Sequence, residues 1–430
     1  MTERVGHGDS AAATHEASSA ATHEAPAAAT SRVRRMLRDP HAVLAVCAFA
    51  VFTDVAGSGI ILPAIPEFAE LFGASEAVMG YAFATFALAF LVSVLPLGRL
   101  VGATGRADLV VAGGMFAIVV AALCFIRADT VWGFVLGQAF HGVGSAGAWV
   151  AGQPLAARMA REKARAGLWF SAITIAMGLG LVLGPLVGAI GDLRTPFVVY
   201  GVVAAIAVVA SLVVLPGAHG PPDGRVIRYR TTFKNRQVMA ACLAIFVLYL
   251  GIGVLEVVFP LFMDRHGAEK SGIGVLFFWF AVFLVGSQPL AGRWMDRIGP
   301  VTPTVIALVA AVPLFSLAVL GTSFAYWMPV FMLLGIATGV PVSATMMIIA
   351  SSARPGEHAA AYALWNFSFS VGYLIGPAAG GALAGLSSDW PVVGGLRLPF
   401  FVFSVFALLC VPLFRRLALS RPPAAIPPVS

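Results

Sequence analysis

Twelve apolar runs of membrane-spanning length constrain this chain more than any other feature of its sequence. A helix rises roughly 1.5 Å per residue, so about 20 apolar residues cross the ~30 Å hydrocarbon core of a bilayer. The runs cover residues 41–65, 77–97, 109–126, 131–156, 168–190, 196–215, 238–262, 272–291, 301–321, 325–350, 359–385 and 397–414. The sequence therefore predicts an all-α membrane protein with twelve transmembrane helices.

The composition agrees with a chain embedded in lipid. Hydrophobic residues make up 59% and charged residues 11% of the 430 residues, and the mean hydropathy is +0.91. A soluble domain cannot bury so much apolar surface, so the lipid bilayer is an expected partner. The net charge of +7 comes from Lys and Arg that cluster between the apolar runs, as membrane topology requires. No nucleic-acid partner is therefore expected.

The sequence contains no pattern of an enzyme, a metal site or a cofactor site. Lys163, Lys234 and Lys270 do not follow a glycine, so a Walker A loop is excluded. No Cys/His cluster has metal-ligand spacing, and no G-x-S-x-G motif occurs. The four cysteines lie inside apolar runs, where disulfides are not expected. We therefore expect no enzymatic activity, no metal and no cofactor.

A polar stretch at residues 216–237 divides the chain into six spans and six spans. We predict a disordered cytoplasmic tail (1–40), an N-terminal six-helix bundle (41–215), a cytoplasmic linker (216–237), a C-terminal six-helix bundle (238–414) and a cytoplasmic tail (415–430). With the N-terminus inside, 22 of the 27 Lys and Arg residues also lie inside. This imbalance predicts a multi-pass protein of the cell membrane with both termini cytoplasmic.

The two halves of the chain repeat each other's glycines and prolines. At an offset of 194 residues, the first-half set Gly57, Gly59, Pro66, Gly98, Arg99 and Gly105 matches Gly251, Gly253, Pro260, Gly292, Arg293 and Gly299. At an offset of 192 residues, the set Gly180, Gly184, Pro185 and Gly188 matches Gly372, Gly376, Pro377 and Gly380. Such repeats are typical of secondary transporters, in which one bundle rocks against the other around a central site.

Several of these motifs resemble the major facilitator superfamily over nearly the whole chain, from residue 41 to 415. The segment from Gly292 to Gly299, with Asp296 and Arg297, resembles the cytoplasmic loop motif between spans two and three of that family. Its first-half copy, with Gly98, Arg99 and Gly105, lacks the Asp-Arg pair. The resemblance implies a major facilitator fold of two pseudo-symmetric six-helix bundles.

Two further motifs narrow the resemblance to the twelve-span drug:proton antiporter branch. The pattern G-x-x-x-G-P-x-x-G in the fifth span, repeated in the eleventh and ending there in Gly380-Gly381, resembles the antiporter motif. Within that branch, the first-span segment around Asp54, Glu256 in the seventh span and the segment before Pro377 resemble vesicular amine transporters. Asn366 stands where that group has an aspartate.

Asp54 and Glu256 are the only acidic residues well inside predicted spans, and no Lys or Arg lies well inside one. A carboxylate at mid-bilayer costs about 2.5–3.5 kcal/mol on insertion scales, so it must face a cavity, a partner or a proton. We predict that both acids couple protons or bind cations. The alternative is a neutral acid hydrogen-bonded to a neighbouring helix. His141, the only histidine inside a span, is a candidate proton relay or a packing residue.

Neutral polar and aromatic residues inside the spans are candidates for lining a substrate cavity, or for ordinary contacts between helices. They are Gln138, Gln288, Asn366, Trp365, Tyr249 and Tyr373. The glycines and prolines of the two antiporter-like motifs are candidates for gating or hinge motion, or for tight packing. They are Gly180, Gly184, Pro185, Gly188, Gly372, Gly376, Pro377, Gly380 and Gly381.

The leading functional hypothesis is a monomeric proton-coupled antiporter. It exports lipophilic or cationic small molecules by alternating access, and the resemblance supplies the export direction. A proton-coupled importer or facilitator of a small polar nutrient is one alternative. A non-transporting membrane receptor or scaffold is another.

Overall fold

The structure, a computed structural model, describes residues 40–152, 166–216, 229–353, 358–386 and 394–419. This part of the chain is helical and contains no strand. The predicted tail at 1–40 and most of the linker at 216–237 lie outside the described residues, as does the end of the chain from residue 420.

Helices in the described residues coincide with all twelve predicted spans. In the first half they are α2 (Pro40–Ile61), which continues through the 3-10 turn η1 (Leu62–Ala64) into α3 (Ile65–Phe72), then α4 (Glu76–Thr104), α5 (Ala107–Ile126), α6 (Val131–Gly147) with the π-helical turn η2 (Ala148–Gly152), α8 (Ala166–Gly188) and α9 (Thr195–Val214). In the second half they are α11 (Arg236–Arg265), α12 (Lys270–Ile298), α13 (Val301–Ala318), α14 (Phe324–Ser352), α15 (His358–Leu386) and, after η3 (Gly395–Arg397), α16 (Leu398–Ala418). The short α10 (Tyr229–Thr232) precedes α11.

Ten candidate spans in the described part are long and apolar enough to cross a membrane. The two remaining spans are α6 and α8, which border the undescribed range 153–165. The fold expected from the sequence, an all-α membrane protein, is therefore confirmed.

Polar capping residues set where several helices begin. The side chain of Asn235 accepts hydrogen bonds from the amides of Gln237 (3.1 Å) and Val238 (3.3 Å) at the start of α11. Ser75 and Thr130 cap α4 and α6 in the same way. These bonds satisfy amides that have no partner within the first helical turn.

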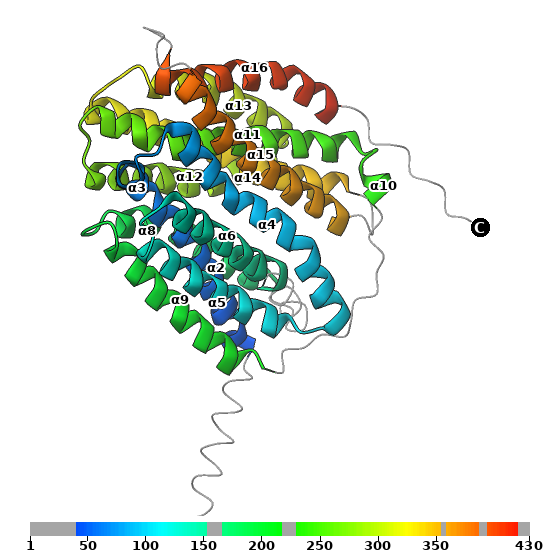
Figure 1. The fold of residues 1–430 in the computed structure, drawn as a ribbon. Helices are drawn as coiled ribbons and strands as arrows, with labels where there is room; N and C mark the ends of the chain where they lie inside the picture. Colours follow the sequence, from blue (N-terminus) through cyan, green and yellow to red (C-terminus); the bar gives the residue numbers. More distant parts are fainter. Residues whose placement is uncertain (1–39, 153–165, 217–228, 354–357, 387–393, 420–430) are drawn as a thin grey trace, which may run out of the picture.

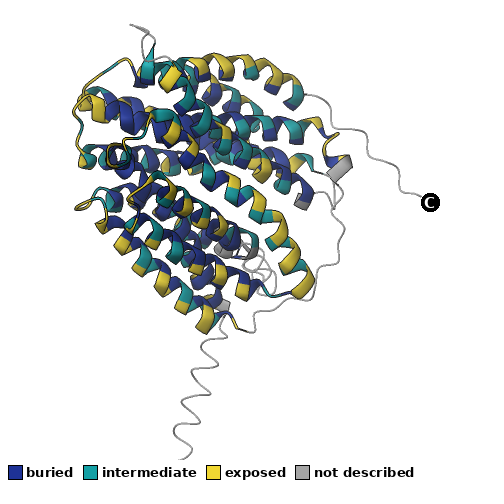
Figure 2. Ribbon diagram, in the orientation of Figure 1, coloured by how far each residue is buried: buried dark blue, intermediate teal, exposed yellow. Residues whose placement is uncertain are grey.

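The helices form two groups that lie side by side (Figure 1). One group contains α2 to α9 and the other α11 to α16, and contacts between them run through the pairs α4–α15, α8–α12 and α3–α11. Buried residues face the inside of the molecule, and the exposed side chains on its outside include many large apolar ones (Figure 2). Leu290 and Val92, for example, are each 64% exposed. An apolar exterior of this extent suits contact with lipid.

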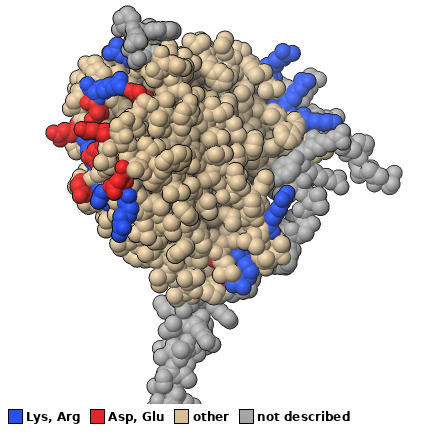
Figure 3. All heavy atoms as spheres, in the orientation of Figure 1, with Lys and Arg blue, Asp and Glu red and all other residues tan. Residues whose placement is uncertain are grey.

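The charged side chains of the visible face leave a broad belt without charge (Figure 3). Acidic and basic residues mix at its left edge, and Lys and Arg predominate at its right edge. We call the end of the molecule that holds the connections 73–75, 127–130, 189–194 and 266–269 the distal face. By the charge imbalance of the sequence, the distal face is expected to lie outside the cell.

Glycines of the antiporter-like motifs bring helix backbones together. A methyl group placed on Gly184 of α8 would lie 2.6 Å from the carbonyl oxygen of Ala56 on α2. In the second half, a methyl group on Gly376 of α15 would overlap the carbonyl oxygen of Leu250 on α11. These two contacts lie within one half each, whereas Gly381 of the second motif packs against α4 of the first half. The predicted role of both motifs in gating stays a prediction.

Candidate functional site

Asp54 lies in the middle of α2 and is 3% exposed. Its carboxyl oxygen Oδ2 accepts hydrogen bonds from Trp149 Nε1 (2.7 Å) and Ser145 Oγ (3.0 Å). His141 Nε2 lies 3.5 Å from Oδ1 and 3.3 Å from the backbone oxygen of Asp54. All three partners belong to the first half of the chain, so Asp54 is enclosed within the N-terminal group of helices.

The partners of Asp54 follow helical spacing. His141, Ser145 and Trp149 are four residues apart, which places them on one face of α6 and its extension. Trp149 sits in η2, a π-helical turn at Ala148–Gly152. Such turns inside α-helices occur frequently at functional sites. The sequence interpretation named Asp54 and His141 but missed Ser145 as a partner, although this fourfold spacing could have indicated it.

Glu256 lies on α11 and accepts a hydrogen bond from the hydroxyl of Tyr373 on α15. The ring of Tyr373 contacts Tyr249 at a centroid distance of 6.2 Å and stacks on Phe369 at 6.1 Å. Tyr249 meets Phe369 edge to face at 4.2 Å. The predicted residues Tyr249, Glu256 and Tyr373 therefore come together in one site.

Aromatic residues of α4 extend this site into the first half of the chain. The ring centroids of Phe83 and Phe86 lie 6.1 and 5.9 Å from that of Tyr373. Phe86 also lies 4.8 Å from the ring of His141. A single phenylalanine thus contacts the surroundings of both carboxyl groups, between the two halves.

The other predicted cavity residues do not form one lining. Gln138 is buried on α6, one turn from His141. Trp365 is buried, donates to Thr345 Oγ1 at 3.0 Å and stacks on Phe369 at a centroid distance of 6.4 Å, so it adjoins the aromatic rings near Glu256. Asn366 is exposed and donates to the backbone oxygen of Tyr362 on its own helix at 3.0 Å. Gln288 is half-buried on α12.

The loop motifs lie at the opposite end of the molecule from the distal face. Gly105 and Gly299 follow the last turns of α4 and α12 with φ of 66° and 77°, a conformation that favours glycine. Asp296 and Arg297 are exposed in the last turn of α12, after Gly292. The corresponding turn of α4 contains Gly98 and the exposed Arg99. This symmetry of position supports the repeat inferred from the sequence.

Ion pairs join the two halves at the distal face. Lys270 Nζ at the start of α12 lies 3.0 Å from Glu67 Oε2 on α3 and 3.0 Å from the backbone oxygen of Asp192. Arg265, at the end of α11, pairs with Glu76 at the start of α4. Hydrogen bonds from Thr195 lower the pKa of the Asp192 carboxyl and fix this turn. We call the contacts of Lys270 and Arg265 with Glu67, Glu76 and Asp192 the distal latch.

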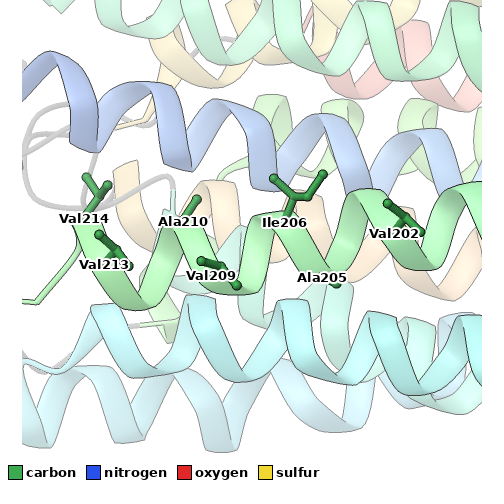
Figure 4. A pocket seen from close by; sticks show the side chains of 7 residues that line it. All are labelled: Val202, Ala205, Ile206, Val209, Ala210, Val213 and Val214. Carbon is green, nitrogen blue, oxygen red and sulfur yellow. The ribbon is translucent and has the colours of Figure 1, made fainter.

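A shallow hollow on the surface of α9 carries none of this chemistry (Figure 4). The side chains that line it are all aliphatic: Val202, Ala205, Ile206, Val209, Ala210, Val213 and Val214. An aliphatic surface of this kind on a membrane-spanning helix suits lipid tails.

The comparisons with known proteins agree with this architecture. The family model described as the Major Facilitator Superfamily matches residues 47–239 and 241–429. Multidrug resistance protein 2 of Bacillus subtilis is 32% identical over 169 residues, which are 38% of this chain and 39% of that protein. The aligned region thus spans about two fifths of this relative. The purine ribonucleoside efflux pump NepI of Salmonella typhimurium is 27% identical over 371 residues, 83% of this chain and 91% of that protein.

Solved transporter structures share the fold. A bacterial homologue of the human lysosomal transporter Spinster superposes with a TM-score of 0.72 at 14% identity, covering 88% of this chain and 97% of that one. The nucleoside transporter NupG superposes with a TM-score of 0.69 at 13% identity, covering 88% of this chain and 100% of that one. The chain is a multi-pass membrane transporter of small molecules rather than an enzyme, and it belongs to the Major Facilitator Superfamily.

Proposed function

We propose that this transporter is a proton-coupled antiporter that exports lipophilic or cationic small molecules across the cell membrane. The supporting observation is the setting of Asp54, a carboxyl group 3% exposed at the middle of a spanning helix. Its partners His141, Ser145 and Trp149 carry no permanent positive charge. A buried carboxyl group without a permanent cation nearby is suited to exchanging a proton.

Asp54 and His141 are the two groups that bind and release the proton in this proposal. Two hydrogen bonds to Oδ2 stabilise the ionised carboxylate, because Trp149 and Ser145 both donate to it and a donor binds a charged oxygen more strongly than a neutral one. The second oxygen, Oδ1, faces His141 Nε2 at 3.5 Å, so the pair can hold one proton between them. Proton uptake weakens the two hydrogen bonds and so favours a different arrangement of α2 and α6.

Glu256 is the candidate cation site. Tyr373 contacts it, and Tyr249 and Phe369 pack on the ring of Tyr373. Ring faces attract organic cations, and a carboxylate supplies the opposite charge. The names of two relatives, a multidrug resistance protein and a purine ribonucleoside efflux pump, support export as the direction. The proton and the cation then act on different carboxyl groups that are linked by the movement of the two halves.

The test uses inverted membrane vesicles with a pre-formed pH gradient. Addition of ethidium, a lipophilic cation, is expected to discharge the gradient in the unchanged protein. Asp54→Asn is expected to abolish the response, and Glu256→Gln is expected to raise the ethidium concentration needed for it by about tenfold or more. Asp129→Asn, at a side chain 71% exposed, is the matched control and should respond normally.

Three results would contradict the proposal. A normal response in both acid variants would remove Asp54 and Glu256 from the coupling. Transport of ethidium without proton movement would favour a facilitator, and neither transport nor binding of any tested cation would favour a receptor.

Export of purine nucleosides is a second candidate. The edge-to-face and stacked rings of Tyr249, Phe369 and Tyr373 suit a planar base as well as an organic cation. Inosine in the same vesicle assay distinguishes the two, because a neutral nucleoside should depend on these rings and not on the charge of Glu256.

A further inference from the structure

Polar side-chain atoms without hydrogen-bond partners gather near Asp54. Within the described residues, five such buried atoms occur: Asp54 Oδ1, Gln138 Nε2, His141 Nδ1, Tyr200 Oη and Ser211 Oγ. All five belong to α2, α6 and α9 of the first half. The second half contributes none from its described residues.

Four of these atoms lie on neighbouring turns of three packed helices. The ring of Tyr200 meets that of His141 edge to face at 5.9 Å. The Tyr200 hydroxyl lies against Gly57, because a methyl group placed on this glycine would overlap it. Gly57 is one turn from Asp54, and Gln138 is one turn from His141. We call Asp54, Gln138, His141 and Tyr200 the polar column.

Burial of these unpaired polar atoms is energetically unfavourable unless the polar column binds a polar molecule. The exposed fractions of Asp54, Gln138, His141 and Tyr200 are 3%, 1%, 1% and 2%. A buried donor or acceptor without a partner destabilises the fold, because it has lost its hydrogen bonds to water and gained none in return. Buried water commonly satisfies such groups and makes about three hydrogen bonds when several polar atoms surround it. Four such groups close together therefore point to bound water.

The polar column ends at a cluster of phenylalanines toward the distal face. Phe134 precedes Gln138 by one turn of α6, and Phe197 precedes Tyr200 by one turn of α9. These two rings pack with Phe68 and Phe125 at centroid distances between 5.0 and 5.7 Å. Each of the four is no more than 1% exposed. Apolar constrictions of this kind close water paths by excluding water.

We propose that the polar column holds water molecules that carry protons between Asp54 and the phenylalanine cluster. The route runs inside the first half of the chain, separate from the aromatic rings around Glu256. Along this route, each water molecule accepts a proton on one side and releases one on the other, so the number of protons bound along the route does not change. The proton-carrying role rests on the proposed antiport, whereas the binding of water does not.

Radiolytic hydroxyl-radical labelling tests the bound water directly, because radicals formed from a buried water modify the side chains beside it. The full-length protein in lipid nanodiscs is irradiated, and modification is read by mass spectrometry. Relative to intrinsic reactivity, His141 and Tyr200 should be labelled about tenfold more than Phe331, a dry residue that is 0% exposed. Equal labelling of all three would overturn the proposal, whatever the transport assay shows.

Two conservative variants test the proton route. Tyr200→Phe and Gln138→Leu keep most of the packing and remove a polar atom of the column. Each is expected to slow ethidium-driven proton movement by about tenfold or more and to leave ethidium affinity unchanged. Tyr249→Phe, beside Glu256, is the matched control and should change ethidium affinity instead. Unchanged proton rates in both column variants, with normal folding by size exclusion, would overturn the route.

Discussion

The two oxygens of Asp54 have different surroundings, and this difference decides what the carboxyl group can do. Oδ2 is held by Trp149 and Ser145, whereas Oδ1 has only the nearby Nε2 of His141 at 3.5 Å. A neutral acid satisfied by its neighbours would need a partner for its own proton. Nε2 of His141 also faces the backbone oxygen of Asp54, which can only accept a hydrogen bond, so Nε2 carries a hydrogen and gives Oδ1 no acceptor for a proton. Within the described residues Oδ1 has no hydrogen-bond partner, and this supports the proposed proton exchange over permanent neutrality.

Trp149→Phe tests the stabilisation of the ionised carboxylate. The variant keeps an aromatic ring but removes the donor at 2.7 Å from Oδ2. A hydrogen bond to a charged group contributes about 1.5–3 kcal/mol, and about 1.4 kcal/mol corresponds to a factor of ten. Because loss of the donor removes part of the stabilisation of the ionised form, ethidium-driven proton movement in inverted vesicles should slow by about tenfold.

The matched control for Trp149 is Trp365→Phe. Trp365 donates to the hydroxyl of Thr345 in the second half, with no carboxyl group involved. Its rate of ethidium-driven proton movement should stay unchanged. Equal slowing in both variants would show that the change comes from general loosening of the helices and not from Asp54.

At the scale of elements, α4 is one of the helices through which the two halves are in contact. It packs on α6 in its own half and on α15 in the other. Glycines allow the close approach to α15: the Cα atom of Gly80 would lie 3.0 Å from a methyl group placed on Gly381. Movement of one half against the other must change this contact, since it crosses between them.

Gly381→Ala is expected to weaken the contact between α4 and α15. The added methyl group would overlap the carbonyl oxygen of Glu76 on α4. Overpacking of this kind costs about 1–3 kcal/mol, so the thermal unfolding temperature in detergent should fall by several degrees. Gly385→Ala, one turn further along α15, meets only Ala77 at 3.8 Å and should leave the temperature unchanged.

The sequence predicted the helices better than the contacts between them. Apolar length alone located each span, and helix ends followed polar caps such as Asn235. The first helix continues through Pro63 and Pro66 as far as Phe72, seven residues beyond its predicted end. Pro63 lies at the start of η1 and Pro66 in the first turn of α3, where a proline interrupts no helical hydrogen bond. The contact of Tyr200 with His141 could not be predicted, because nothing in the pattern of α9 shows which of its faces meets α6.

At the scale of the whole molecule, the distal latch describes a state in which the two halves are closed at that face. Lys270 and Arg265 come from the second half, and Glu67, Glu76 and Asp192 come from the first. The partners of these ion pairs are 203 and 189 residues apart in sequence, so only docking of the halves creates them. Alternating access requires the latch to open in the other state.

A charge exchange tests whether the latch sets the balance between the two states. Lys270→Glu places like charges beside Glu67, whereas the double variant Lys270→Glu, Glu67→Lys restores an attractive pair. Exposed ion pairs contribute about 0.2–1 kcal/mol, so the single variant should raise the population open at the distal face by up to about fivefold.

Spin labels on cysteines introduced at the exposed Glu70 and Glu269, in a protein without its native cysteines, report the separation of the halves by double electron–electron resonance. The single variant should increase the long-distance population and the exchanged pair should reduce it again. Arg194→Met breaks an ion pair with Asp129 on the same face but within the first half, and should have no effect. If the exchanged pair stays as open as Lys270→Glu, attraction between these two charges does not hold the distal face closed, and the remaining contacts between the halves, such as the packing of α4 on α15 and of α8 on α12, must do so.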